Sequence, residues 1–271
     1  MSADPDRSSR PPRPARSPGP GDLPRPSGDA LPVGYYHEVL LRGGPVRRAW
    51  HVHKFQRVID CLPPGPGLSI LDVGCSAGSF LSLLDGERFA RQVGVDIEPD
   101  QIAYAQARFG TPFRRFVHIP SVAELDQAGD GFDCVTLIEV IEHLQPHEVE
   151  VLLAKVAELL KPGGLLVITT PNYTSLWPVL ELIVSWVSEV AYTEQHVTRF
   201  TFFDMMKKLR RLRPAIGDEL QLEMKTTSHF LSPFLAAISM RLADRVARWA
   251  APRSWRFPFG NLILMTLRKR S

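Results

Sequence analysis

Short apolar runs alternate with longer stretches of helical periodicity through the middle of the chain. The runs typical of strands are Ser69–Val73, Gln92–Val95, Phe116–Ile119, Cys134–Ile138 and Leu165–Thr169. Apolar residues at helical spacing between these runs predict helices over roughly 77–86, 99–109 and 147–160. Strands that alternate with helices in this way form parallel βαβ units, with helices on both faces of the sheet.

The regions on either side of this alternation have their own patterns. Residues 34–62 predict a helical segment that ends at Pro63-Pro64-Gly65-Pro66-Gly67. The segment Leu176–Tyr192 is very apolar, but it contains two glutamates and is shorter than the roughly 20 residues of a bilayer span, so we expect a buried or interfacial helix. Further elements are predicted near 202–213 (helix), 220–227 (strand), 233–250 (helix) and Asn261–Leu267 (strand). We expect one of the last two strands to run antiparallel at the sheet edge.

Composition indicates a globular protein with a disordered start. The chain has 271 residues, of which 44% are hydrophobic, and this excludes a fully disordered protein. Residues 1–33 hold 9 of the 24 prolines and no apolar stretch of a secretory signal, so we expect a solvated tail there. The three cysteines show no metal-ligand spacing and favour a reducing, cytoplasmic environment.

The formal net charge of +3 conceals a strong division along the chain. Residues 34–200 hold 13 basic and 20 acidic side chains, whereas residues 201–271 hold 14 basic and 5 acidic ones. Within the helix predicted at 233–250, Arg241, Arg245 and Arg248 form a basic stripe beside an apolar one. Such a helix suits an anionic membrane surface, although a solvated face over a core helix is the commoner arrangement.

The candidate chemistry begins at the first predicted strand, which runs into a glycine-containing turn. Residues 70–80 read ILDVGCSAGSF, with glycines at 74 and 78 where a ligand has to approach the backbone closely. Asp96 follows Gly74 by 22 residues at the tip of the second strand, in position to accept hydrogen bonds from ribose hydroxyls. Together these features predict a nucleotide-like cofactor.

The spacing separates two classes of cofactor. A dinucleotide loop, G-x-G-x-x-G, would need glycines at 74, 76 and 79, but positions 76 and 79 are serines. The run Asp72, Gly74, Ser76, Gly78 instead resembles the D-x-G-x-G-x-G motif of class I S-adenosylmethionine-dependent methyltransferases, with Ser76 in place of the middle glycine. Residues 132–144 and 160–169 are similar to that family's fourth strand and its fifth helix-to-strand turn.

The resemblance implies the fold and the cofactor site. It implies an α/β, Rossmann-like, seven-stranded twisted and mostly parallel sheet with helices on both faces, plus C-terminal helical additions. The domain would span 34–271, with a cofactor-binding core at about 66–172 and an acceptor-capping, basic region at about 173–271. S-adenosylmethionine would lie over the carboxyl ends of the first, second and fourth strands, against Asp72, Gly74, Cys75, Ser76, Gly78, Asp96, Ile97, Ser121 and Ile138.

The residues after the fourth strand are the candidates for acting on the methyl acceptor. If this segment is helical, Glu139 faces Glu142 at i+3 and His143 at i+4. The cluster resembles the Glu-x-x-Glu-His segment of ubiquinone-biosynthesis O-methyltransferases and of small-RNA 2′-O-methyltransferases, where the second group adds a later histidine, here His196. The resemblance implies a divalent ion such as Mg on these four residues, and two carboxylates with one or two imidazoles suit Mg, Mn and Zn alike. The alternatives are that His143 or His196 acts directly as a base, or that the residues are structural.

Two further sets of residues can be interpreted either as part of the core or surface, or as part of the site. We interpret His51, His53, His118 and His147 as ordinary surface or core histidines. Tyr35, Tyr36 and His37 are either a lid over the substrate or, as we favour, part of the core.

The sequence therefore predicts a cytoplasmic methyltransferase for a small-molecule or lipid-linked acceptor, most simply by O-methylation, with a basic C-terminal region that suits peripheral membrane contact. Nucleic acid is a disfavoured partner, because no RNA-recognition module is evident. The alternatives are an RNA 2′-O-methyltransferase, a non-catalytic cofactor-binding assembly subunit and, more remotely, a nicotinamide-dependent oxidoreductase.

Overall fold

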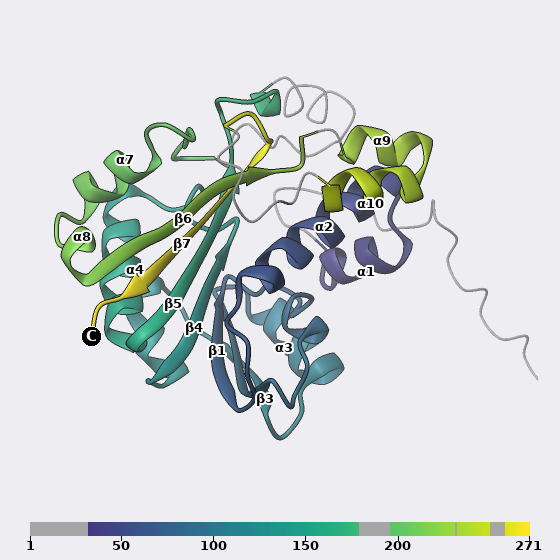
Figure 1. The fold of residues 1–271 in the computed structure, drawn as a ribbon. Coiled ribbons are helices and arrows are strands. Elements are labelled where there is room, and N and C mark those ends of the chain that lie inside the picture. The colour runs from purple at the N-terminus through teal and green to yellow at the C-terminus, as the bar shows by residue number, and fades with distance from the viewer. Residues whose placement is uncertain (1–31, 179–195, 231, 250–257) are drawn as a thin grey trace, which may run out of the picture.

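A single sheet of seven strands organises the molecule (Figure 1). The computed structural model describes residues 32–178, 196–230, 232–249 and 258–271. The strands are β1 (Leu68–Val73), β2 (Phe89–Asp96), β3 (Arg114–His118), β4 (Phe132–Ile138), β5 (Leu160–Pro171), β6 (Leu220–Ser228) and β7 (Leu262–Lys269). Their order across the sheet is β3-β2-β1-β4-β5-β7-β6, so the strand order reverses between β1 and β4. The predicted class of fold is confirmed.

The pairing of β7 departs from the prediction. One antiparallel strand was expected at the edge of the sheet, but β7 is the antiparallel strand and lies between β5 and β6. The burial pattern explains its inner place, since six consecutive residues from Leu262 to Leu267 are buried, as expected of a strand covered on both faces. β6, with three exposed positions in a row, forms the edge.

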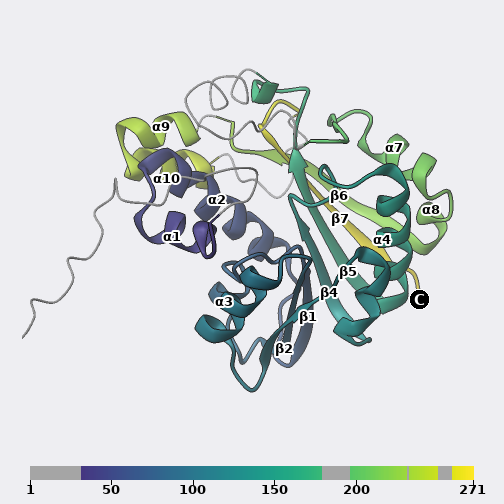
Figure 2. The ribbon, with the colours of Figure 1, turned by 180° about the vertical axis from the view of Figure 1, so that it is seen from behind.

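Helices cover both faces of the sheet. On one face lie α4 (Pro146–Leu159), α7 (Met205–Leu212) and α8 (Ile216–Glu219), whose apolar side chains share one core cluster with the sheet. On the other face, α2 (Pro45–Cys61) and α3 (Pro99–Phe109) contribute to a second cluster. Figure 2, from behind, shows α4, α7 and α8 grouped on the side away from α3.

Four helices form a cap beside the carboxyl ends of the strands. α1 (Tyr35–Arg42) and α2 pack with α9 (Ser232–Ile238) and α10 (Met240–Trp249), as Figures 1 and 2 both show. Helices that are distant in sequence thus meet in the cap. The ion pair between His53 Nε2 and Asp244 Oδ1, at 2.8 Å, joins α2 to α10.

Several helix predictions were right in place but wrong in extent. The helices expected at 99–109 and 147–160 are α3 and α4, whereas the segment 34–62 is divided at Gly43-Gly44 and the segment 233–250 at Ser239. Pro45 begins α2 at the position where a missing N–H costs nothing. The helix expected over Leu176–Tyr192 falls largely on residues 179–195, outside the described residues.

The helix expected at 77–86 is absent. Only a short 3-10 helix, η1 (Leu81–Leu83), forms there, because Gly78 adopts a left-handed φ of 74° that interrupts a right-handed helix. The other short 3-10 segment is η2 (Val122–Ala128), which follows β3. Among the described helices, none combines the length and the hydropathy that crossing a membrane requires.

Candidate active site

Left-handed backbone marks the carboxyl edge of the sheet. In the described part of the chain, three residues other than glycine have positive φ: Ser76 (46°), Glu139 (55°) and His229 (64°). They follow β1, β4 and β6, three strands that point the same way. Such conformations cost free energy and gather at functional sites, so this edge is where a site is expected.

The turn after β1 is shaped by Gly74 and Gly78. Gly74 has a φ of 73°, and a Cβ atom on it would lie 2.5 Å from the Val140 side chain. A Cβ atom on Gly78 would lie 2.7 Å from the Phe116 ring. Both glycines are therefore required by close packing, and they leave the loop folded over the end of the strand. Ser76, in place of the motif's middle glycine, accepts the left-handed conformation itself.

Asp96 fixes this loop from the tip of β2. Its carboxylate accepts hydrogen bonds from the Ser76 N–H at 2.7 Å and from the Glu98 N–H at 3.0 Å. Burial raises the pKa of Asp96, while these N–H donors oppose the rise. Ile97, next to it, is 55% exposed and presents an apolar surface. Ser121 lies after β3, where its hydroxyl accepts the Ala123 N–H and caps η2.

Asp72 lies beneath the loop, where β1 ends. It is buried and accepts a hydrogen bond from the Thr136 hydroxyl at 2.6 Å. Burial, more than any neighbouring charge, raises the pKa of Asp72 to about 7. Its carboxyl therefore titrates close to neutral pH and can change its charge when a cation arrives.

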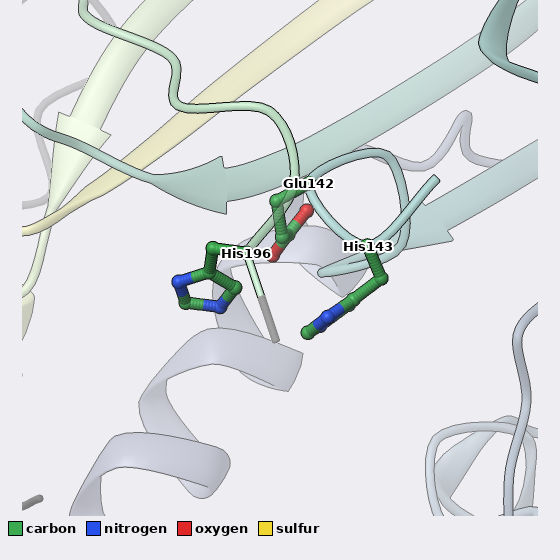
Figure 3. Close-up of side chains that lie close together, drawn as sticks. All are labelled: Glu142, His143 and His196. Carbon is green, nitrogen blue, oxygen red and sulfur yellow. The ribbon is translucent and has the colours of Figure 1, made fainter. Parts of the chain in front are cut away.

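Three of the four predicted ligand residues come together. The ligand atoms of Glu142, His143 and His196 all lie within 4.8 Å of one another. Figure 3 shows the two imidazoles on either side of the Glu142 carboxylate. The Thr198 N–H donates to the Glu142 backbone oxygen at 3.0 Å, which brings the chain beyond β5 back over the turn that carries Glu142.

The predicted helix over 139–143 is wrong, and this changes the cluster. The segment after β4 is a turn, with His143 N bonded to Val140 O, and α4 begins only at Pro146. Glu139 consequently does not share a helix face with Glu142. Its carboxylate forms an ion pair with Lys54 of α2, and this pairing holds the pKa of Glu139 below its usual value despite burial.

Glu142 is the buried member of the cluster. It is 1% exposed, and neither carboxylate oxygen has a hydrogen-bond partner among the described residues. Burial, with a further contribution from the charge of Glu139, raises the pKa of Glu142 to about 8. A buried carboxylate with two unsatisfied oxygens costs free energy, which is repaid when a ligand binds to it.

The Tyr173 hydroxyl orients His196. It lies 2.8 Å from His196 Nδ1, so Nε2 is the ring nitrogen left toward the cluster. A hydrogen bond to one ring nitrogen fixes the tautomer and the ring orientation of a histidine whose other nitrogen binds a metal or moves a proton. The rings of His143 and His196 have their centroids 5.0 Å apart.

A cavity of about 290 Å³ connects the loop after β1 with the cluster. Asp72, Gly74, Cys75, Ser76 and Ile138 line it on one side, and Glu139, Glu142, His143 and His196 on the other. Asp96, Ile97, Gly78 and Ser121 do not line it and lie farther along the sheet edge. The cavity is thus continuous from the predicted cofactor residues to the predicted acceptor residues.

The cap supplies the third wall, which the sequence analysis largely missed. Tyr35, Tyr36, Trp50, His51, Lys54 and Phe55 all come from α1 and α2 and line the cavity. His51 was grouped with ordinary histidines, and the tyrosines were assigned to core packing. The signal for Lys54 was present, since it falls four residues after Trp50 and four before Val58, on an otherwise apolar helix face.

Trp50 anchors this wall. Its ring centroid lies 4.5 Å from that of His229 and 5.1 Å from that of Trp177. His229 Nε2 lies 2.9 Å from the Trp50 backbone oxygen, and burial lowers the pKa of His229 to about 4, so the ring is neutral and donates this hydrogen bond. The aromatic wall is therefore fixed to the loop after β6.

A comparison with protein families shows to which family the chain belongs. A sequence profile described as a methyltransferase domain matches residues 47–211, more than half of the chain. The chain belongs to this methyltransferase family. The match includes the loop after β1, the cluster after β4 and His196, and it confirms the resemblance found in the sequence.

Curated relatives of this methyltransferase are O-methyltransferases of ubiquinone biosynthesis. The protein of that name from Azorhizobium caulinodans is 35% identical over 150 residues, 55% of this chain and 57% of the relative. The Rhizobium etli protein is 31% identical over 180 residues, 62% of this chain and 70% of the relative. For the first three relatives, the matched part spans only about half of their length.

Solved structures share the fold. A chain from the complex of the Haloferax volcanii Trm112 methyltransferase activator with a putative methyltransferase has a TM-score of 0.58 at 18% identity, covering 88% of this chain and 95% of that one. An S-adenosylmethionine-dependent methyltransferase from Archaeoglobus fulgidus has a TM-score of 0.56 at 19% identity, covering 87% and 99%. The N-methyltransferase NodS of Bradyrhizobium japonicum, in complex with S-adenosylhomocysteine, has a TM-score of 0.53 at 15% identity, covering 85% and 91%.

Proposed function

We propose that this protein transfers the methyl group of S-adenosylmethionine to a hydroxyl oxygen of a small or lipid-linked acceptor. The observation that carries the proposal is the single cavity that joins the loop after β1 to Glu142, His143 and His196. The names of the curated relatives support oxygen as the methylated atom.

The residues at the strand ends fit the cofactor. Asp96 retains acceptor capacity at the tip of β2 for the two ribose hydroxyls, and the exposed side chain of Ile97 offers an apolar surface for the adenine. Gly74, Cys75, Ser76 and Gly78 form the loop against which the cofactor would lie, with Ser121 and Ile138 at its flanks. Asp72 is buried and its pKa lies near neutral pH, so its carboxyl group suits the ammonium group of the methionine part of the cofactor.

When bound, the cofactor supplies an electrophilic methyl group on a positively charged sulfur. The protein's own contribution is to hold donor and acceptor in line, about 3 Å apart, in a partly enclosed cavity. Glu142, His143 and His196 are placed to bind the acceptor oxygen and to receive its proton. We assign the proton transfer to His143 or His196, because burial keeps Glu142 mostly protonated at neutral pH.

A divalent ion fits the same cluster. The carboxylate of Glu142 and the two imidazoles form a donor set for it, and an ion there would lower the pKa of an acceptor hydroxyl. Of the four predicted ligand residues, Glu142, His143 and His196 have their ligand atoms within 4.8 Å of one another, whereas Glu139 pairs with Lys54.

We further propose that the cap lies against an anionic membrane surface on the cytoplasmic side. α10 exposes Arg241, Arg245 and Arg248 together with Leu242, and Ile238 at the end of α9 is 80% exposed. Cations beside exposed aliphatic side chains are typical of helices that lie in a lipid interface. A lipid-linked acceptor would then reach the cavity from the membrane.

Isothermal titration calorimetry with S-adenosylmethionine and S-adenosylhomocysteine tests the cofactor assignment. The proposal predicts micromolar binding of both, with one site per chain. An absence of binding, with NADH or another dinucleotide binding instead, would overturn it.

A further inference from the structure

Ser79 has a buried hydroxyl group in the wall of the active-site cavity. The residue is 3% exposed, and it is one of the residues after β1 that line the cavity. Its Oγ atom has no hydrogen-bond partner among the described residues. A buried hydroxyl without a partner costs free energy, and such groups are uncommon in native proteins. A ligand that binds in the cavity would supply the missing partner.

The local backbone offers a partner that this hydroxyl does not use. Serine side chains in short helical turns commonly bond to a backbone oxygen three or four residues earlier. Ser82 does so, since its hydroxyl donates to the Ser79 backbone oxygen at 2.7 Å. The Ser79 hydroxyl makes no such bond within the described part of the chain. The two serines therefore differ, because the Ser82 hydroxyl holds the turn together and the Ser79 hydroxyl does not.

Ser79 lies where the loop after β1 meets the cap. The ring of the next residue, Phe80, packs against the ring of Phe55 on α2, with centroids 5.6 Å apart. Asp72, at the end of β1, lines the same cavity. Ser79 and Asp72 therefore belong to one wall, which is formed by β1 and the segment that follows it.

The carboxylate of the proposed cofactor needs a donor on this wall. Asp96 suits the ribose hydroxyls and Asp72 suits the ammonium group of the methionine part. The carboxylate is attached to the same carbon atom as the ammonium group, so its donor has to lie near Asp72. Lys54, a cation of the cavity wall, already donates to Glu139. A carboxylate only accepts hydrogen bonds, and a serine hydroxyl without a partner can donate one.

We propose that the Ser79 hydroxyl donates a hydrogen bond to the carboxylate of the methionine part of S-adenosylmethionine. The inference rests on the cofactor binding proposed above. It adds to the site a residue just beyond the glycine motif, which ends at Gly78. The hydrogen bond orients the methionine part, and with it the sulfur that carries the methyl group.

Calorimetry of the purified chain with two ligands tests this contact. The ligands are S-adenosylmethionine and its decarboxylated form, which keeps the ammonium group and the positively charged sulfur but lacks the carboxylate. Ser79→Ala should weaken the binding of S-adenosylmethionine about tenfold, because one charge-assisted hydrogen bond is lost. The same variant should change the binding of the decarboxylated form less than twofold.

Ser82→Ala is the matched control. It removes a serine hydroxyl three residues away that has a partner and does not line the cavity. We expect it to leave both affinities within twofold of the wild type and to lower the free energy of unfolding of the cofactor-free chain. Ser79→Ala should not lower that free energy, because it removes a buried hydroxyl that has no partner. Denaturant unfolding without cofactor measures this difference.

Two results would overturn the inference. The first is an affinity of Ser79→Ala for S-adenosylmethionine within twofold of the wild type. The second is an equal loss of affinity for both ligands, which would assign to Ser79 a role in the shape of the loop and not at the carboxylate. Failure of the proposed function looks different, since the wild-type chain would then bind neither ligand.

Discussion

Ser76 shows how a single side chain can depart from a motif without destroying the loop. The motif's middle glycine is replaced, yet Ser76 adopts a φ of 46° and gives its N–H to Asp96 at 2.7 Å. A left-handed serine costs about 1 kcal/mol, and the charge-assisted hydrogen bond to Asp96 contributes a similar amount in the opposite direction. The loop is therefore retained, although a strict motif search would count a mismatch.

Asp96 is the proposed acceptor for the ribose hydroxyls of the cofactor. Replacing it with alanine removes the proposed ribose acceptor and the partner of the Ser76 N–H. We expect Asp96→Ala to weaken S-adenosylmethionine binding by roughly 10-fold to 100-fold, from the loss of one or two charge-assisted hydrogen bonds. Calorimetry measures this, with Asp126→Ala, an exposed aspartate, as the matched control. Equal affinities of the two variants would contradict the assignment.

Asp72 predicts a pH dependence with a defined sign. Its pKa is raised from 3.8 to about 7 in the folded chain, so between pH 4 and pH 7 the folded state holds a proton that the unfolded state has lost. Raising the pH through this window therefore lowers the free energy of unfolding of the cofactor-free protein, by about 1 kcal/mol per pH unit from this group.

Asp72→Asn should flatten that slope. Denaturant unfolding at pH 5, 6 and 7 measures it, and Asp130→Asn, which changes an exposed carboxyl, should keep the wild-type slope. The proposed approach of the cofactor's ammonium adds a second effect, since it favours the ionised carboxylate. S-adenosylmethionine affinity should then rise between pH 6 and pH 8 in the wild type, and rise less in Asp72→Asn. A stability slope of Asp72→Asn equal to that of the wild type would refute the role of Asp72.

At the scale of elements, the sequence predicted what local pattern determines. β1, β4, α3 and α4 were found close to their observed bounds, because apolar periodicity and flanking prolines or glycines define them. The loop after β1 and the presence of Glu142, His143 and His196 near one another also followed from motif and order. The strands, the helices and the loop depend on neighbours along the chain, whereas the place of His196 followed from the resemblance to a known family.

The elements that were missed depend on backbone conformation or on distant partners. The helix expected at 77–86 fails at the left-handed Gly78, and the helix expected over 139–143 fails at the left-handed Glu139. The inner place of β7 is set by its pairing with β5 and β6, and the union of α2 with α10 by contacts such as that of His53 with Asp244, which are distant in sequence. Periodicity marks Lys54 as a charge on an apolar helix face, but it contains no record of which distant segments that face contacts, so Lys54, His51 and Trp50 could not be placed in the site.

A substitution in the cap helix α2 should weaken acceptor binding while leaving cofactor binding almost unchanged. Trp50 lies in the cavity wall against Trp177 and His229, whereas Asp96 does not line the cavity. Once an acceptor is known, Trp50→Ala should raise its KM at least fivefold while changing S-adenosylmethionine affinity less than threefold. Steady-state kinetics and calorimetry measure the two quantities, with Val52→Ala on an exposed position of the same helix as the control. A large loss of cofactor affinity would show instead that Trp50 supports the cofactor.

At the scale of the whole molecule, acidic and basic side chains are concentrated in different parts of the chain. The acidic part of the sequence, residues 34–200, includes the strands that would hold a cationic cofactor, whereas residues 201–271 carry an excess of basic side chains that includes the arginines of α10. A net charge near zero concealed this division.

The proposed membrane contact makes a measurable prediction at this scale. The triple variant Arg241→Gln/Arg245→Gln/Arg248→Gln should reduce cosedimentation with vesicles that contain phosphatidylglycerol by at least fivefold, because each exposed arginine contributes about 1 kcal/mol at an anionic surface. Wild-type binding should also weaken as salt rises from 0.05 to 0.5 M. The matched control is Lys207→Gln/Arg210→Gln/Arg211→Gln on α7, on the other side of the molecule. Equal losses for the two triple variants would exclude a specific role for α10.

Methyl transfer itself is the most direct test of the account. The purified chain is incubated with S-adenosylmethionine labelled in its methyl group and with a lipid and metabolite extract, and the labelled product is identified by mass spectrometry. We predict a labelled methyl group on an oxygen atom, formed by the wild type, reduced at least 100-fold in Glu142→Gln and, at a cofactor concentration below the wild-type KM, at least tenfold in Asp96→Ala. A labelled product with the methyl group on nitrogen, or no labelled product from a wild-type chain that binds the cofactor, would contradict the account.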